Sequence, residues 1–157
     1  MWQKPLLNAQ KKQKQYYSGK KKRHTLKAQL VVNQATGQIL CTAFDKGRVH
    51  DFRLFKQQRV PLLPEQLCLG DKGYQGMAKL HSLSCTPTRK PRKFELSECE
   101  RQHNRLLASI RITVEHSIRR LKIFRILAER YRNRRKRFGL RFNLIAAIVN
   151  FELTLRA

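Results

Sequence analysis

Acidic residues are scarce in this sequence, and none occurs before Asp45. The 157 residues include 10 Asp and Glu against 35 Lys and Arg, which gives a formal net charge of +25. A field of this sign and strength favours a polyanionic partner, most simply nucleic acid. A membrane surface is a weaker alternative.

Long apolar runs and paired cysteines are also lacking. No stretch approaches the roughly 18 apolar residues of a membrane span, and the N-terminus has no apolar core of a signal peptide. The four cysteines, Cys41, Cys68, Cys85 and Cys99, lie far apart and form neither a CxxC pair nor a Cys/His cluster. We therefore predict reduced thiols in a cytosolic protein, with no membrane partner, no disulfide and no zinc site.

The length fits one domain or a piece of a larger protein, and a hydrophobic content of 41% is enough for a core. Residues 1–23 contain eight Lys and Arg, no acid and no helical or strand period. Such a segment is either a solvated, disordered run or a basic arm that follows phosphates, and the acid-free composition favours the arm. We assign residues 24–157 to a single domain.

Hydrophobic periodicity in that domain predicts a mixture of strands and helices. Residues 24–33 and 38–44 read as strands, and the short turn between them predicts an antiparallel hairpin. The remaining predicted elements are a helix over 52–58 capped by Asp51, a strand over 67–70, a short helix over 74–80, an extended basic segment over 82–93 with a strand near 84–88, a long helix over about 95–130, and a buried helix over 138–155.

Asp71 follows the short apolar strand at 67–70, in the stretch LCLGDKGYQG. Gly70 and Gly73 allow the backbone to turn tightly there. A carboxylate at the exit of a buried strand is well placed to be a metal ligand or a catalytic acid. It is equally well placed to cap the following turn, which Asp often does.

Glu115 is the candidate acid of the long helix. Arg111, Glu115 and Lys122 are spaced by four and seven residues and therefore share one helical face. Arg119 and Arg120 lie nearby, so the role of Glu115 could also be limited to ion pairs with these arginines, about one helical turn away.

The order strand, strand, helix, strand, helix, strand, long helix is the layout of a ribonuclease-H-like fold, in which helices flank a mixed sheet. In that layout, carboxylates from the sheet and a late helix hold two divalent metals for phosphodiester chemistry. Mg²⁺ requires hard oxygen ligands, which Asp71 and Glu115 would provide.

Four blocks of the sequence resemble the DDE transposases of bacterial insertion sequences, specifically the insertion sequence five group. They are YYSGKKKRHTLK, GRVHDFRLF, LGDKGYQG and RITVEHSIRRLKIFRIL, in the family's order and spacing. The resemblance implies that Asp71 and Glu115 are the second and third carboxylates of the triad and ligands of Mg²⁺ or Mn²⁺. It further implies that Lys122 contacts DNA near the scissile phosphate, with Arg111 in support. A tyrosine usual in a related group is replaced by Ala108.

The family's first Asp lies upstream of the YYSGK block, where this sequence has no acid. We therefore expect an α/β fold, ribonuclease-H-like and truncated at its N-terminal strand. The same gap predicts a chain that binds DNA but neither cuts nor joins it alone, with transposon ends and target DNA as ligands. An upstream transposase fragment or a full-length copy would be the protein partner, in the bacterial cytoplasm and at the nucleoid.

Two readings remain open: a partial DDE transposase, and a non-catalytic basic nucleic-acid-binding protein that is a remnant or a regulator. Both require a DNA-binding surface, because phosphate contact needs only Lys and Arg. The residues that we expect to form it are Lys20, Lys21, Lys22, Arg23, Arg119, Arg120, Arg134, Arg135, Lys136 and Arg137.

Overall fold

The computed structural model describes residues 16–18, 22–58 and 60–156. It contains helices and short two-stranded sheets, so the mixed α/β class predicted from the sequence is confirmed. The chain divides into two compact units, which we call the hairpin unit (Met1–His50 with Thr113–Ala157) and the turn unit (Asp51–Ile112). The elements in chain order are β1 (Tyr17–Ser18), β2 (Arg23–His24), β3 (Leu26–Val32), β4 (Ile39–Lys46), α1 (Asp51–Gln58), β5 (Cys68–Leu69), the 3₁₀ turns η2 (Lys72–Tyr74) and η3 (Met77–Lys79), β6 (Ser84–Cys85), α2 (Glu98–Ile110), α3 (Ile112–Ile123), α4 (Arg125–Ala128), the 3₁₀ turn η4 (Arg135–Arg137) and α5 (Phe138–Thr154).

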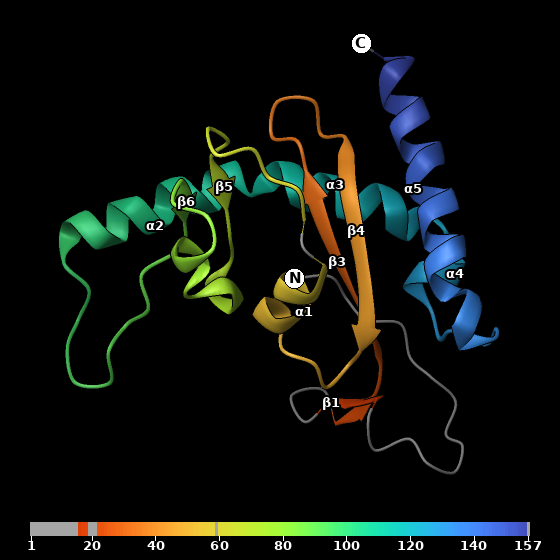
Figure 1. Ribbon diagram of the computed structural model, residues 1–157, viewed down its shortest axis with the longest axis horizontal. Coiled ribbons are helices and arrows are strands. Elements are labelled where there is room, and N and C mark those ends of the chain that lie inside the picture. Colours follow the sequence, from red (N-terminus) through yellow and green to blue (C-terminus); the bar gives the residue numbers. More distant parts are fainter. Residues whose placement is uncertain (1–15, 19–21, 59, 157) are drawn as a thin grey trace. The chain divides into compact units, whose positions relative to one another are not determined.

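The hairpin unit is built around the antiparallel pair β3–β4, which confirms the predicted hairpin (Figure 1). Its register runs from Leu26 opposite Lys46 to Val32 opposite Ile39, with an irregularity at Val31–Val32. The turn that follows closes because the Asn33 side chain accepts a hydrogen bond from the Ala35 amide at 2.9 Å. This is the local backbone capping that makes Asn a good turn residue.

Helix α5 covers the outer edge of β4. Asn150 uses its side-chain amide as a strand would use its backbone: Ile39 N donates to Oδ1 at 2.8 Å, and Nδ2 donates to Ile39 O at 2.9 Å. Phe142 of α5 meets Phe44 of β4 edge-on, with 5.1 Å between ring centroids. The helix therefore satisfies an exposed strand edge and buries aromatic surface at the same time.

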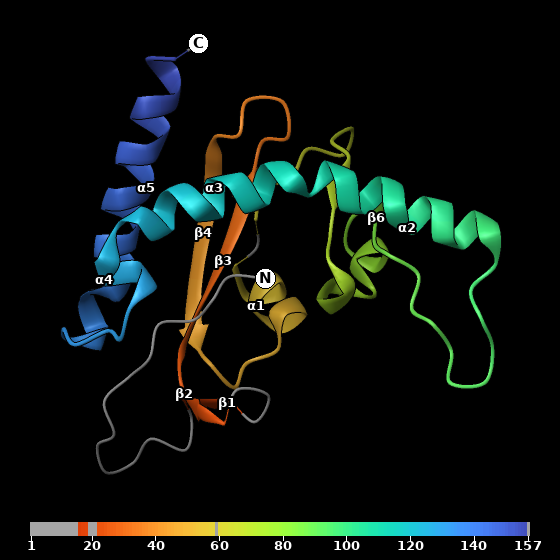
Figure 2. The same cartoon turned by 180° about the vertical axis from the view of Figure 1, so that it is seen from behind.

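Helix α3 crosses one face of the same hairpin, as Figure 2 shows from behind. Ser117 anchors it: its hydroxyl donates to Gly37 O at 2.9 Å and lies 3.2 Å from Thr113 O. Gly37 has a φ of +73°, a conformation that favours glycine. Ile118 and Leu121 of α3 are buried in the core cluster of the unit.

The turn unit has much shorter strands. β5 pairs with β6 in parallel, Cys68 opposite Ser84 and Leu69 opposite Cys85, and the two 3₁₀ turns lie between them in the chain. The predicted helix over 74–80 is thus a pair of 3₁₀ turns. The buried hydrophobic side chains of this unit are Leu54, Phe55, Met77 and Leu107.

The prediction of one long helix over 95–130 is wrong, because the segment forms α2, α3 and α4. α2 begins only at Glu98, where Ser97 and Glu100 form a reciprocal capping box. The helix breaks at Arg111 within the stretch Ile110–Val114, which is rich in β-branched residues of low helix propensity. It breaks again at Phe124, whose ψ of 106° is extended.

Helix α5 is present as predicted but is not buried all round. Phe138, Phe142, Ile145 and Val149 are buried, whereas large apolar residues on its other side are exposed. No helix within the described residues is long and apolar enough to cross a membrane.

Candidate active site

Asp71 lies two residues beyond β5 and caps the turn η2, so the capping role considered from the sequence is real. Its Oδ1 accepts a hydrogen bond from Gly73 N at 3.1 Å, and its carbonyl accepts one from Tyr74 N at 2.8 Å. Gly70 just before it donates to Cys85 O of β6 at 2.9 Å, which ties the turn to the sheet. The backbone of Asp71 is therefore fixed on both sides.

The other carboxylate oxygen of Asp71 faces a cation. Arg111 Nη2 lies 3.7 Å from Asp71 Oδ2, and the two side chains are 30% and 27% exposed. Arg111 is the C-cap residue of α2, so the end of that helix fixes the position from which the Arg111 side chain extends. The sequence paired Arg111 with Glu115 and Lys122 on one face, and the structure shows a contact with Asp71 that helical spacing cannot reveal.

Helix α1 packs against the turn that carries Asp71. A Cβ added at Gly73 would lie 3.1 Å from Asp51 Oδ2, and one added at Gly76 would lie 3.5 Å from the Phe52 ring. Phe55 meets Tyr74 edge-on, with ring centroids 6.1 Å apart. Glycine at these positions thus allows α1 to approach the turn closely.

Tyr74 lies near the carboxylates of Asp51 and Asp71. The pKa of the Tyr74 phenol is raised well above its ordinary value. Burial is the main cause, and the charges of Asp51 and Asp71 contribute less. Burial also raises the pKa of the Cys68 thiol. Both groups therefore stay protonated and neutral beside Asp71 near neutral pH. The sequence predicted Asp51 only as a helix cap, so its place beside Gly73 and Tyr74 was not anticipated.

Glu115 and Lys122 belong to the hairpin unit, in the first and last turns of α3. They are seven residues apart on one unbroken helix, which places them on the same face two turns apart. Glu115 is exposed, and Lys122 is half-buried. Of the two arginines between them, Arg119 is exposed and Arg120 is half-buried.

Comparisons with known proteins agree on one family. The family described as DDE superfamily endonuclease matches residues 3–151. The chain belongs to this family. A DDE relative, the probable transposase for insertion sequence element IS702 of Microchaete diplosiphon, is 52% identical over 153 residues. The match covers 98% of this chain but 55% of the relative, so the chain spans about half the length of that protein. No solved structure matches the chain.

Membership of the DDE family implies a divalent metal, and the described residues fit one only in part. Asp71 offers carboxylate oxygens, the donor type that Mg²⁺ prefers, and its side chain is partly exposed. No group of three or more His, Cys, Asp or Glu side chains that could hold a metal occurs within the described residues.

The predicted DNA-binding residues fall into two sets. Lys20 and Lys21 lie outside the described residues, Lys22 is an exposed turn residue with a φ of +49°, and the backbone of Arg23 pairs with Ser18 in the β1–β2 ladder. In the second set, Arg134, Lys136 and Arg137 are exposed, and Arg135 packs over the Tyr16 ring with 4.6 Å to its centroid.

Buried Tyr131 supports the second set. Its hydroxyl accepts a hydrogen bond from Arg141 Nη1 at 2.8 Å and lies 3.4 Å from Arg134 O. The ring meets Phe138 edge-on with centroids 5.1 Å apart. Tyr131 therefore links the loop of cations to the core of the hairpin unit, in addition to the contact of Arg135 with Tyr16.

Proposed function

We propose that this chain is the catalytic part of a bacterial insertion-sequence transposase, of the insertion sequence five group, which cleaves and transfers DNA strands with a DDE triad. Asp71 supplies the second carboxylate and Glu115 the third. The observation that carries the proposal is Asp71 itself: a family carboxylate at a strand exit, fixed by a glycine turn and contacted by Arg111. An Asp that served only as a turn cap would need no such partner.

The remaining roles follow from chemistry and placement. Asp71 and Glu115 would hold a divalent metal, Mg²⁺ or Mn²⁺, which when bound activates a water or 3′-hydroxyl nucleophile. Arg111 orients the Asp71 carboxylate, because a guanidinium can hold it in one rotamer. Lys122, on the Glu115 face of α3, is placed to contact a DNA phosphate. We propose residues 24–157 as one partial catalytic domain and residues 1–23 as its basic arm.

A further strand would complete a ribonuclease-H-like sheet and carry the first Asp of the triad. β3 is the element that supports this proposal, because within the described residues it pairs with β4 alone. At the outer edge of β4, the Asn150 side chain pairs with the backbone of Ile39. Next to or within β3, Thr25 Oγ1 and Gln29 Oε1 are buried without a hydrogen-bond partner in the described part of the chain. Such groups are expensive to leave unpaired, so an added strand would stabilise the hairpin unit.

The test is reconstitution. The chain would be fused to, or expressed with, the part of the Microchaete diplosiphon transposase that it does not span. We expect Mg²⁺-dependent nicking of DNA carrying the element's ends, abolished by Asp71→Asn or Glu115→Gln. Glu98→Gln, which removes an exposed acid of α2, is the matched control and should retain activity.

Two outcomes would contradict the proposal. Asp71-dependent nicking by the chain alone would show that its own residues complete the triad. Failure of a folded, DNA-binding reconstituted enzyme to cleave would favour the second candidate function, DNA binding without catalysis. That candidate is supported by the net charge of +25 and would place the chain on the nucleoid of a bacterial cytoplasm.

A further inference from the structure

The loop between β6 and α2 presents the sequence Arg89-Lys-Pro-Arg-Lys-Phe94 at the surface of the turn unit. All six residues are exposed, and the Phe94 side chain retains 71% of its accessible surface. With four cations and an exposed aromatic ring in six residues, this loop differs from the other basic clusters, which lie in the hairpin unit. The predicted DNA-binding residues include none of this loop.

The loop is fastened at both ends. Before it, the Asn104 side chain of α2 pairs with the backbone of Thr88: Thr88 N donates to Oδ1 at 2.9 Å, and Nδ2 donates to Thr88 O at 3.1 Å. After it, the capping box fixes Ser97, whose backbone N donates to Glu100 Oε2 at 2.8 Å. Residues of α2 therefore hold both ends of the loop.

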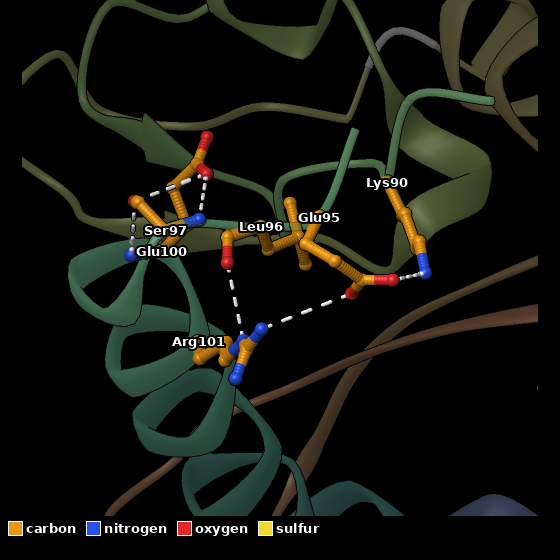
Figure 3. A network of polar contacts seen from close by, with 6 residues as sticks. All are labelled: Lys90, Glu95, Leu96, Ser97, Glu100 and Arg101. Carbon is orange, nitrogen blue, oxygen red and sulfur yellow. Dashed lines mark hydrogen bonds and ion pairs between the residues drawn. The ribbon is translucent and has the colours of Figure 1, made fainter. Parts of the chain in front are cut away.

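Glu95 adds a third restraint, shown in Figure 3. Its carboxylate pairs with Lys90 across the loop and lies 3.8 Å from Arg101 Nη2. Arg101 Nε in turn donates to Leu96 O at 3.1 Å. Glu95 is the single acid between Asp71 and Glu98, so it neutralises part of the loop's charge and holds its shape.

These restraints matter for binding. Ordering a flexible basic loop on a ligand costs conformational entropy, and a loop that is already tied down loses less. Pro91 fixes one further backbone angle at the tip. Arg89, Arg92, Lys93 and Phe94 are therefore all exposed on a loop whose two ends are held in place.

We infer that the Arg89–Phe94 loop binds single-stranded DNA, with Arg89, Arg92 and Lys93 on phosphates and Phe94 stacked on an unpaired base. Clustered cations beside an exposed aromatic ring suit single-strand binding, because the cations contact phosphates and every base offers a stacking face. The inference rests on the proposed function only in that the ligand is DNA. It gives the turn unit, which carries Asp71, its own nucleic-acid contact.

The experiment measures affinity for a labelled single-stranded oligonucleotide across a salt series. Phe94→Ala should weaken binding about 5- to 150-fold, the range that aromatic–base stacking spans, with a smaller effect on a duplex of the same sequence. Replacing Arg89, Arg92 and Lys93 together by Gln should lower the slope of log affinity against log salt by about 2.

Glu95→Gln provides a prediction of opposite sign. It should steepen the salt slope, because Lys90 and Arg101 lose their acid partner and become available to phosphates. Glu98→Gln makes the same change of charge outside the loop network and should leave the slope closer to that of the unaltered chain. Equal effects of the two substitutions would mean that net charge alone matters and would overturn the loop assignment.

Other outcomes also separate the possibilities. Unchanged single-strand affinity and slope in the loop variants, with binding by the unaltered chain intact, would overturn this inference and leave the proposed function standing. No DNA binding by the unaltered chain would overturn both. Phe94-dependent binding to phosphatidylserine vesicles, without an effect on the oligonucleotide, would mean that the loop is a membrane contact instead. All the substituted residues are exposed and outside the cores, so thermal unfolding should confirm that the variants fold.

Discussion

Among the described residues, twelve buried side chains form one core cluster in the hairpin unit, whereas the turn unit buries four large hydrophobic side chains. Besides the two-residue pair β1–β2, the hairpin unit has strands of seven and eight residues, while the strands of the turn unit have two residues each. The turn unit is stabilised by glycine turns, the hydrogen bonds of Asn104 with the Thr88 backbone and a capping box, whereas the hairpin unit is stabilised by aromatic packing. Glu115 therefore stands on a well-packed scaffold and Asp71 on one held by local polar contacts, which we expect to open first.

The largest expected effect is the loss of Phe142, which has no exposed surface and contacts Phe44 and Phe138 in the hairpin unit. Phe142→Ala should lower the free energy of unfolding by about 3 to 5 kcal/mol, because it removes apolar burial and leaves a cavity. Urea unfolding measures this change in the free energy of unfolding. Phe151→Ala, on the exposed side of the same helix, should change it by about 0.5 kcal/mol or less. Similar losses would show that α5 has no buried side.

Met77→Ala should destabilise the turn unit by about 2 kcal/mol, near the lower end for a buried methionine. Met77 is buried beside Gly70, where an added Cβ would lie 3.0 Å from its methyl group. Hydrogen exchange read by mass spectrometry should show faster exchange in peptides from 51–112 and little change in those from α5. Exposed Leu80 supplies the control, Leu80→Ala. Uniform acceleration over the whole chain would mean that the two units unfold as one.

Arg111→Gln should lower stability by less than about 1 kcal/mol, because its pair with Asp71 is partly exposed and screened by water. Its effect on DNA cleavage by the reconstituted enzyme should be much larger, since Asp71 loses the group that orients it. Arg125→Gln breaks the more exposed pair with Glu129 and should leave cleavage intact. Equal cleavage by both variants would remove Arg111 from the site.

The smallest effect concerns Glu95, where the hydrogen bond and charge of Lys90 lower the pKa of the carboxyl group. A lowered pKa in the folded chain means that the contact is fully present above the ordinary value for Glu and is lost as the pH falls through the lowered value. An NMR titration of the carboxyl group should show a midpoint that Lys90→Gln moves upward. An unmoved midpoint would show that the loop is not restrained by this pair.

Several features were accessible from local sequence patterns. The strands of the hairpin, the helix after Asp51 and the position of Asp71 at a strand exit all follow from periodicity and glycine placement over a few residues. The family blocks depend on residue order alone, and the comparisons confirmed the DDE family. Other features were missed because they join residues far apart in the chain: the Arg111–Asp71 pair spans 40 positions, and the Asn150–Ile39 pair spans 111. Helical spacing cannot reveal either of them.

The sequence by itself determined the charge, the family and the residues available for chemistry, because these depend on composition and order. Tertiary structure decided how they are held. It paired Arg111 with Asp71, left one side of the apolar helix α5 exposed, and brought Asp51 of α1 against Gly73. The physical reason is that burial and pairing depend on which distant segment arrives, whereas a turn or a strand depends on its own few residues.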